Sequence, residues 1–246
     1  MKKVSFLVIA FLFVLMVSMP GIAGATLYDL NTDWSNSVNP NGAWTYRQGT
    51  SVLPLQTNYN SSGQYAWAEA NYPSTGHVPV WMQAAVNGAL GANVMAGDIM
   101  VHPTSVSSSL TLGEGNVIWT SPINGTITIS GNVWWGGWSA DRRGVTWLLF
   151  DNSTQLNTGT MYTGDSSTRS SPVNFGSFTE TVNVGDTVMF EAVTASGVTY
   201  PWFVGVNLTI DAESTQSVPE PATMLLLGLG LMGLAGVRRK LKNLKG

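Results

Sequence analysis

The chain has 246 residues and a formal net charge of −3, with ten Trp and no Cys. Residues 26–217 contain four Arg, no Lys and thirteen Asp or Glu, which gives this segment a formal charge of −9. This charge argues against nucleic-acid binding, the missing Lys excludes a P-loop or Schiff-base enzyme here, and the missing Cys excludes disulfides and thiolate metal sites.

The first 25 residues have the layout of a secretory signal peptide. Two Lys precede an apolar run over residues 4–17, and a Pro-Gly pair leads to the small-residue step Ala23-Gly24-Ala25. A basic start, an apolar stretch too short for a comfortable membrane span and an A-x-A step are the three parts of such a signal. We therefore expect export across the inner membrane and cleavage by signal peptidase after Ala25, with Ala23 and Ala25 as the cleavage step.

Residues 26–213 have the alternating pattern of half-buried strands. Ile127, Ile129 and Val133 alternate with Thr, Ser and Asn, and residues 202–210 alternate in the same way. Turn signals such as Asn-Gly and Gly-Asp separate these runs, and the glycines in residues 84–95 argue against the one helix whose composition would be compatible. The pattern predicts an all-β domain, an antiparallel β-sandwich that is jelly-roll-like, with an immunoglobulin-type sandwich as the nearest alternative.

The most distinctive local segment is WWGGWSADRR at residues 134–143. Indole rings beside a Gly-Gly pair can form a platform on which sugar rings stack, while acidic and basic neighbours bond sugar hydroxyls. If the alternation continues past Val133, Trp135 fills the core and Trp134 covers an edge instead. The candidate glycan-binding residues are Trp134, Trp138, Asp141 and Arg142.

The sequence contains no recognisable catalytic constellation. His77 and His102 are too few for a zinc site, and neither H-E-x-x-H nor G-x-S-x-G occurs. A glycoside hydrolase would need only two carboxylates beside aromatic subsites, and no pair is selected among the available acids. Those acids are Glu69, Glu114, Asp141, Glu180, Asp186 and Glu191. We expect no enzyme activity, with a carbohydrate-active hydrolase as an alternative.

Two loop segments, residues 151–154 and 164–166, carry the oxygen ligands that calcium prefers. Asp, Asn and Ser at these places are explained more simply as turn residues. We therefore expect no metal site and no cofactor, with calcium as the alternative.

The C-terminal segment combines a short motif, an apolar span and a basic tail. After residues 214–217, Pro219-Glu220-Pro221 precedes sixteen uncharged residues, 222–237, and a cluster of cations. Sixteen helical residues span about 24 Å, which is short for a hydrocarbon core of about 30 Å. Cations directly after a span stay on the cytoplasmic side, so we expect a C-terminal transmembrane helix with the acidic domain outside the cytoplasm. The basic stop-transfer residues are Arg238, Arg239 and Lys240.

This combination resembles the PEP-CTERM sorting signal of Gram-negative bacteria. The resemblance implies recognition by an exosortase, with Pro219, Glu220 and Pro221 as the recognition element, and transfer of the domain to the cell envelope or an extracellular polysaccharide matrix. Each proline also fixes φ and disfavours helix at the residue before it, so the motif would present an extended peptide just outside the membrane.

The sequence therefore predicts four parts: a signal peptide at 1–25, a β-sandwich at 26–213, a linker at 214–217 and the sorting signal at 218–246. We expect a secreted, exosortase-processed envelope or biofilm-matrix protein that is structural or glycan-associating. Its expected partners are signal peptidase, exosortase, exopolysaccharide and, before processing, the membrane through its C-terminal helix, but not nucleic acid. The alternatives are a hydrolase of the exopolysaccharide matrix and a permanently membrane-anchored protein-binding domain.

Overall fold

The computed structural model describes residues 24–57, 65–70, 78–88, 91–104, 114–137, 141–215 and 226–231. Residues 25–213 form one compact unit, and residues 226–231, which are helical, belong to a second. Within the described residues no helix is both long and apolar enough to cross a membrane. Several predicted features lie outside the described residues: Ala23, Pro219, Glu220, Pro221, Arg238, Arg239, Lys240 and most of the predicted span at 222–237.

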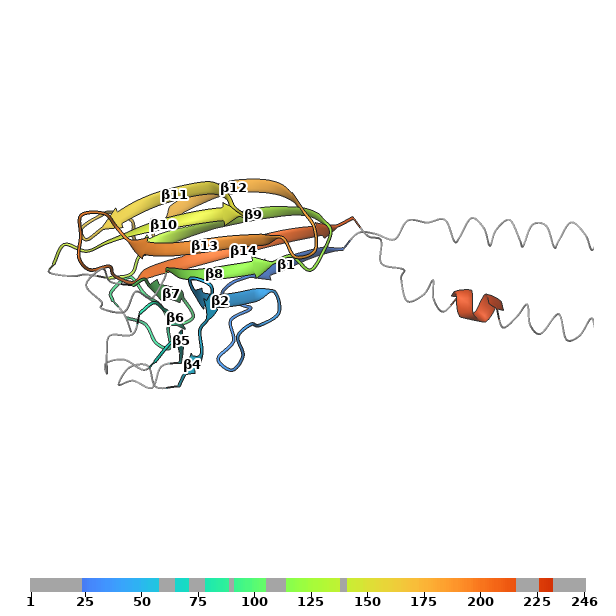
Figure 1. The fold of residues 1–246 in the computed structure, drawn as a ribbon, viewed down its shortest axis with the longest axis horizontal. Helices are drawn as coiled ribbons and strands as arrows, with labels where there is room; N and C mark the ends of the chain where they lie inside the picture. The colour runs from blue at the N-terminus through green and yellow to red at the C-terminus, as the bar shows by residue number, and fades with distance from the viewer. Residues whose placement is uncertain are drawn as a thin grey trace, which may run out of the picture. The chain divides into compact units, whose positions relative to one another are not determined.

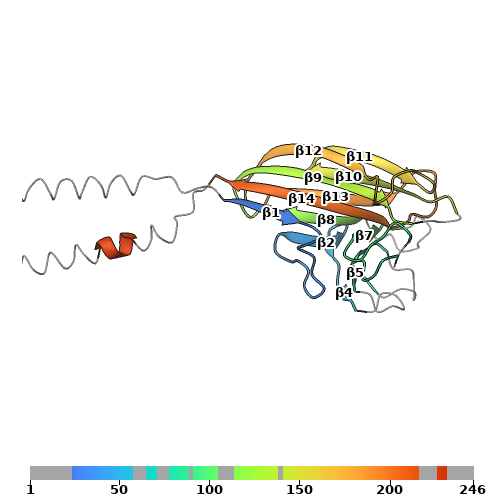
Figure 2. The same cartoon turned by 180° about the vertical axis from the view of Figure 1, so that it is seen from behind.

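The described residues form two antiparallel sheets that pack face to face (Figures 1 and 2). The first sheet follows the order β12 (Val173–Val182), β9 (Gly125–Trp135), β14 (Val204–Ser214), β7 (Ile99–His102), β6 (Val80–Gln83), β5 (Ala66–Ala68) and β4 (Leu55–Gln56), and β1 (Ala25–Asp29) also pairs with β14. The second sheet follows the order β11 (Thr154–Tyr162), β10 (Gly144–Asp151), β13 (Thr187–Thr194), β8 (Gly115–Thr120), β2 (Trp44–Gln48) and β3 (Ser51–Val52). The prediction of an all-β antiparallel sandwich is confirmed.

The core lies between the two sheets, and the apolar residues of the alternating pattern point into it, as predicted. Ile127 and Ile129 of β9 point inward and are fully buried, as are Val188 and Phe190 of β13 on the facing sheet. Burying each such side chain stabilises the fold by about 1.5–3 kcal/mol relative to leaving it in water. The residues between them on β9 are only partly buried, because that face of the first sheet points away from the core.

The order of the strands follows from how the chain moves between the sheets. Five connections cross from one sheet to the other: β8–β9, β9–β10, β11–β12, β12–β13 and β13–β14. Repeated crossing of this kind is typical of jelly rolls, in which two Greek keys are combined. As a result, strands far apart in the sequence become neighbours, and so do the loops that join them.

The sandwich has two distinct ends. At one end Ala25 of β1 lies opposite Glu213 of β14, so the first and last residues of the compact unit are side by side (Figure 1). Ala25, the expected last residue of the signal peptide, is thus also the first residue of β1. At the other end, the loop end, the described parts of three connections meet: residues 136–137 with 141–143, residues 163–172 and residues 195–203. The eleven residues of β14 join the two ends and span about 36 Å.

Candidate functional site

Trp134, a predicted stacking residue, lies in a second hydrophobic cluster on the outer face of the first sheet. The indole is only 1% exposed, packs with Met82 and Met100, and donates its N–H to the Asn93 carbonyl oxygen at 3.0 Å. Gly205 lies directly beneath it, since a Cβ there would be 2.1 Å from the indole ring. The prediction of Trp134 as a glycan platform is therefore wrong for this structure, because both faces of the ring are covered.

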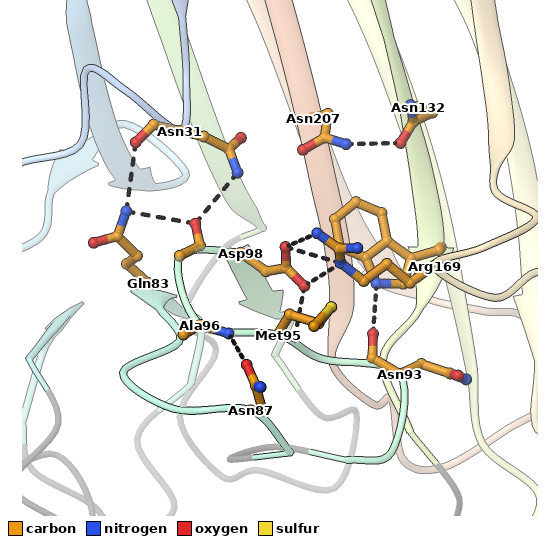
Figure 3. Close-up of polar contacts among 12 residues, drawn as sticks. Asn31, Gln83, Asn87, Asn93, Met95, Ala96, Asp98, Asn132, Arg169 and Asn207 are labelled. Carbon is orange, nitrogen blue, oxygen red and sulfur yellow. Dashed lines mark hydrogen bonds and ion pairs between the residues drawn. The ribbon is translucent and has the colours of Figure 1, made fainter.

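The cover is a loop at residues 84–98, called the covering loop, of which residues 89 and 90 are not described. An ion pair fixes it to the sandwich (Figure 3): Arg169 Nε is 2.8 Å from Asp98 Oδ2, and Arg169 Nη2 is 3.0 Å from Asp98 Oδ1. The same Oδ2 accepts the backbone N–H of Met95 at 2.8 Å. Because the Asp98 side chain is only 5% exposed, this two-point contact neutralises a buried carboxylate and holds the loop over the sheet.

The other residues of the segment 134–143 lie in different environments. Trp135 is buried in the main core, as the continued alternation predicted. Trp138 lies outside the described residues, so its role stays a prediction. Asp141 and Arg142 are both exposed at the loop end, where the connection between β9 and β10 enters β10.

At the loop end, two neighbouring arginines stack on aromatic rings from two other segments. The Arg142 guanidinium carbon is 5.2 Å from the ring centre of Tyr162, at the end of β11. The corresponding Arg143 carbon is 4.7 Å from Trp202 and 5.5 Å from Tyr200, both in the β13–β14 loop. These five residues form the arginine–aromatic cluster. Cation–π contacts of this kind contribute about 0.5–1 kcal/mol each at exposed positions.

Backbone contacts between the strand ends hold this cluster together. Gly144 lies opposite Tyr162 in the β10–β11 register, and its N–H donates to the Tyr200 carbonyl oxygen at 3.3 Å. A Cβ on Gly144 would lie 2.7 Å from the Tyr162 ring, so only glycine allows this approach. Arg143 donates its backbone N–H to Thr163 Oγ1 at 3.1 Å and a side-chain N–H to the Pro201 carbonyl oxygen at 3.2 Å. The loops are therefore tied directly to one another.

His102 lies behind the cluster, at the end of β7. Its ring centre is 4.7 Å from Phe203 and 6.3 Å from Trp202, and Nδ1 is 2.9 Å from the Pro103 carbonyl oxygen. The pKa of His102 is lowered to about 4, chiefly by burial; the hydrogen bond to Pro103 opposes this decrease and the positive charge of Arg143 contributes to it. At neutral pH the imidazole is thus uncharged and supports the aromatic side chains.

The exposed surface of the cluster combines an aromatic ring with charged groups. Tyr200 is 46% exposed, and the Asp141 side chain is 75% exposed, with Oδ2 at 3.7 Å from Arg143 Nη2. Such a surface can stack against an apolar ring face and donate several hydrogen bonds at its edge. The sequence did not single out Tyr162, Tyr200 or Trp202, because they belong to separate segments that only the strand register brings together.

Four of the six candidate catalytic carboxylates fall into two neighbourhoods, Glu114 with Glu191, and Glu180 with Asp186 near Asp151. Burial raises the pKa of Glu191, on the outer face of β13, and the charge of Glu114 adds to the increase. Burial likewise raises the pKa of Asp151, with contributions from Glu180 and Asp186. Across the described part of the chain, no group of three or more His, Cys, Asp or Glu could hold a metal ion.

Asp165, in the second segment considered for calcium, and Asp186, in the turn before β13, both make turn contacts. Asp165 Oδ2 accepts the backbone N–H of Tyr162 at 2.7 Å, and Asp186 Oδ2 accepts that of Asn183 at 2.7 Å. Asn152 adopts a positive φ of 50° in the tight turn between β10 and β11. These are ordinary roles for Asp and Asn in turns.

A separate open groove of about 490 Å³ lies beside β3 and β4, away from any residue that the sequence singled out. Seven of its nine lining residues are apolar, and two of these are prolines. The lining residues are Ser37, Val38, Asn39, Pro40, Val52, Leu53, Pro54, Leu55 and Trp67.

Several solved structures are distantly similar to this chain. The CBM22-1 xylan-binding domain of Paenibacillus barcinonensis Xyn10C is 10% identical, with 80% of this chain and 99% of that domain covered and a TM-score of 0.34. A family 35 carbohydrate binding module from Clostridium thermocellum is 10% identical, with 76% and 98% covered and a TM-score of 0.32. The K3 cleaved adhesin domain of Lys-gingipain from Porphyromonas gingivalis is 10% identical, with 76% and 99% covered and a TM-score of 0.30.

The sequence comparisons point to the C-terminus. No curated protein matches the chain. One family model does, and it covers the segment in which Pro219-Glu220-Pro221, the apolar residues and the first cations follow one another. Residues 217–240 match the PEP-CTERM protein-sorting motif, and this chain therefore carries a PEP-CTERM sorting signal, as the sequence predicted.

Proposed function

We propose that this protein is exported, processed by an exosortase at its PEP-CTERM signal, and then associates with glycan in the cell envelope or extracellular matrix without catalysing a reaction. The sorting signal supports the first two steps, with Pro219, Glu220 and Pro221 as the recognition element and the basic tail as the stop-transfer element. The sandwich, residues 26–213, is the part that remains to act after processing.

The observation that carries glycan association is the arginine–aromatic cluster. Sugar rings present apolar C–H faces that stack on aromatic rings, and hydroxyl groups that accept hydrogen bonds from guanidinium N–H groups. Tyr200 offers an exposed ring with Arg143 stacked on it, and the adjacent residue Arg142 offers further donors beside Tyr162. Because backbone contacts already hold the loops, little conformational entropy would be lost on binding.

The binding test is co-sedimentation of the mature protein, purified from cells expressing the full chain, with the producing organism's own exopolysaccharide. We expect saturable binding that Tyr200→Ala weakens at least fivefold, since stacking on one aromatic ring contributes on the order of 1 kcal/mol or more. Tyr65→Ala is the matched control, because Tyr65 is 44% exposed and precedes β5, outside the cluster. Equal loss in both variants, or no binding by the native protein, would contradict glycan association through this surface.

The processing test is mass spectrometry of the protein in cells and in the medium. We expect the mature protein to lack the apolar span and basic tail, and Glu220→Ala to leave the intact chain in the membrane fraction. Persistence of the intact C-terminus in the native protein would instead support a permanently anchored domain.

A second candidate, a carbohydrate-active hydrolase, rests on Glu191. Glu191 is partly buried, and its pKa is raised by burial and by the charge of Glu114. A carboxyl group with a raised pKa can act as the general acid of a glycosidase, and a second carboxylate, here Glu114, would be the other member of the catalytic pair. Polysaccharide turnover that Glu191→Gln abolishes would favour this candidate, whereas binding without turnover favours the first.

A further inference from the structure

The few positive charges of the sandwich are unevenly placed. Of the four arginines between residues 26 and 217, Arg169 is held by Asp98 at the covering loop, and Arg47 lies on β2. The other two, Arg142 and Arg143, are adjacent at the loop end. An otherwise strongly acidic domain therefore presents half of its cations in one exposed cluster.

Arg142 is available to a ligand in a way that the other arginines are not. It is exposed, its contact in the described structure is the face of Tyr162, and no ion pair with a described carboxylate engages it. A guanidinium carries its five N–H donors around the edge of its plane, so stacking leaves them free to bind acceptors. The tyrosine thus restrains the cation without neutralising it.

The chemistry of this surface favours an anionic acceptor. Guanidinium groups match carboxylates in shape and form two parallel charge-assisted hydrogen bonds, roughly twice as strong as neutral ones. Arg143, the next residue, stacks on Tyr200, so a carboxylate bound by Arg142 and a sugar ring stacked on Tyr200 could belong to neighbouring units of one polymer.

We propose that the glycan bound at the arginine–aromatic cluster is a carboxylated polysaccharide, a chain containing uronic acid residues, with Arg142 as the main carboxylate-binding residue. This inference rests on the proposed glycan association and adds the chemical class of the ligand.

Replacing Asp141 tests the proposal, because the change in binding affinity should have opposite directions for an acidic and a neutral glycan. Its exposed carboxylate approaches Arg143 at 3.7 Å, so it competes with an anionic ligand and repels it. If the ligand were neutral, Asp141 would instead accept hydrogen bonds from sugar hydroxyls. Asp141→Asn therefore strengthens binding of a carboxylated glycan and weakens or leaves unchanged binding of a neutral one.

The experiment measures the affinity of the mature, processed protein for polygalacturonate and alginate, each compared with the same polymer after reduction of its carboxyl groups. We expect at least tenfold tighter binding to the acidic form. Arg142→Gln should remove most of this preference, and Asp141→Asn should increase affinity about threefold, as expected for one unit charge nearby in water. Arg47→Gln is the control, because it changes the net charge equally on β2, which is three strands away from β10 in the second sheet.

The outcomes separate this inference from the proposed function. Equal affinity for acidic and reduced polymers, or weaker binding by Asp141→Asn, would overturn the carboxylate assignment while leaving glycan association intact. Loss of binding in Arg47→Gln equal to that in Arg142→Gln would also overturn it, since net charge alone would then be responsible. Failure to bind these polymers and the organism's own exopolysaccharide would overturn both. Thermal unfolding of each variant identifies any loss that comes from misfolding.

Discussion

Protonation of His102 should lower the free energy of unfolding, by an amount set by the difference between the pKa of this residue in the folded and the unfolded chain. In the folded protein the pKa is about 4, against an ordinary value of 6.5, chiefly because the ring is buried behind the cluster. Below pH 6.5 the unfolded chain binds a proton at this residue and the folded chain does not, so the free energy of unfolding falls as the pH falls towards 4. A gap of about 2.5 pKa units at 1.36 kcal/mol each gives a loss of up to about 3 kcal/mol.

The assay is urea unfolding followed by Trp fluorescence at several pH values between 7 and 4, for the native protein and His102→Gln. Carboxylates titrate in both proteins, so the difference between the two pH slopes isolates the imidazole. We expect the native protein to lose up to about 3 kcal/mol more than the variant over this range. Parallel slopes would refute the reasoning, whatever the absolute stability of the variant, because they would mean that His102 titrates alike in the folded and unfolded chains.

Three other changes test packing and charge. Gly205→Ala should lower the free energy of unfolding by about 1–3 kcal/mol, because its Cβ would lie 2.1 Å from Trp134; unchanged urea midpoints would mean that the indole does not pack there. Glu191→Gln should be more stable than the native protein at pH 7, with the gap closing towards pH 4, because a raised pKa means that ionisation disfavours the fold; a gap that widens in acid would contradict this. Asp98→Ala should accelerate hydrogen exchange in the covering loop, since Arg169 then loses its partner, and unchanged exchange would show that the ion pair does not hold the loop.

The strands of the core could be predicted because their signal is local. Alternation in residues 126–133 and 202–210 requires only that one side of each strand faces apolar neighbours, and β9 and β14 follow it. The same rule predicted that Trp135 fills the core and that Trp134 points away from it, covering an edge. It could not indicate that a loop some forty residues earlier covers the outer face of the first sheet, since the cover depends on Asp98 and Arg169 meeting across the fold.

The candidate site was predictable only in part for the same reason. Asp141 and Arg142 stood out because they follow a Trp- and Gly-rich segment, but the rings on which the arginines stack come from β11 and the β13–β14 loop. Their approach depends on the register that sets Gly144 opposite Tyr162. A one-residue shift in that register would reverse the faces and separate the rings from the arginines.

The course of β14 has a mechanical consequence. The strand starts beside the loop that carries Trp202 and ends at Ser214, and it lies inside the first sheet, with β9 on one side and β7 and β1 on the other. Tension between a polymer held at the loop end and an attachment at the C-terminus would act along the length of this strand. The interstrand hydrogen bonds run perpendicular to that direction, so they would resist in shear and share the force instead of opening one after another. A pull applied between the two ends of the domain would therefore be shared by many hydrogen bonds along β14 at once.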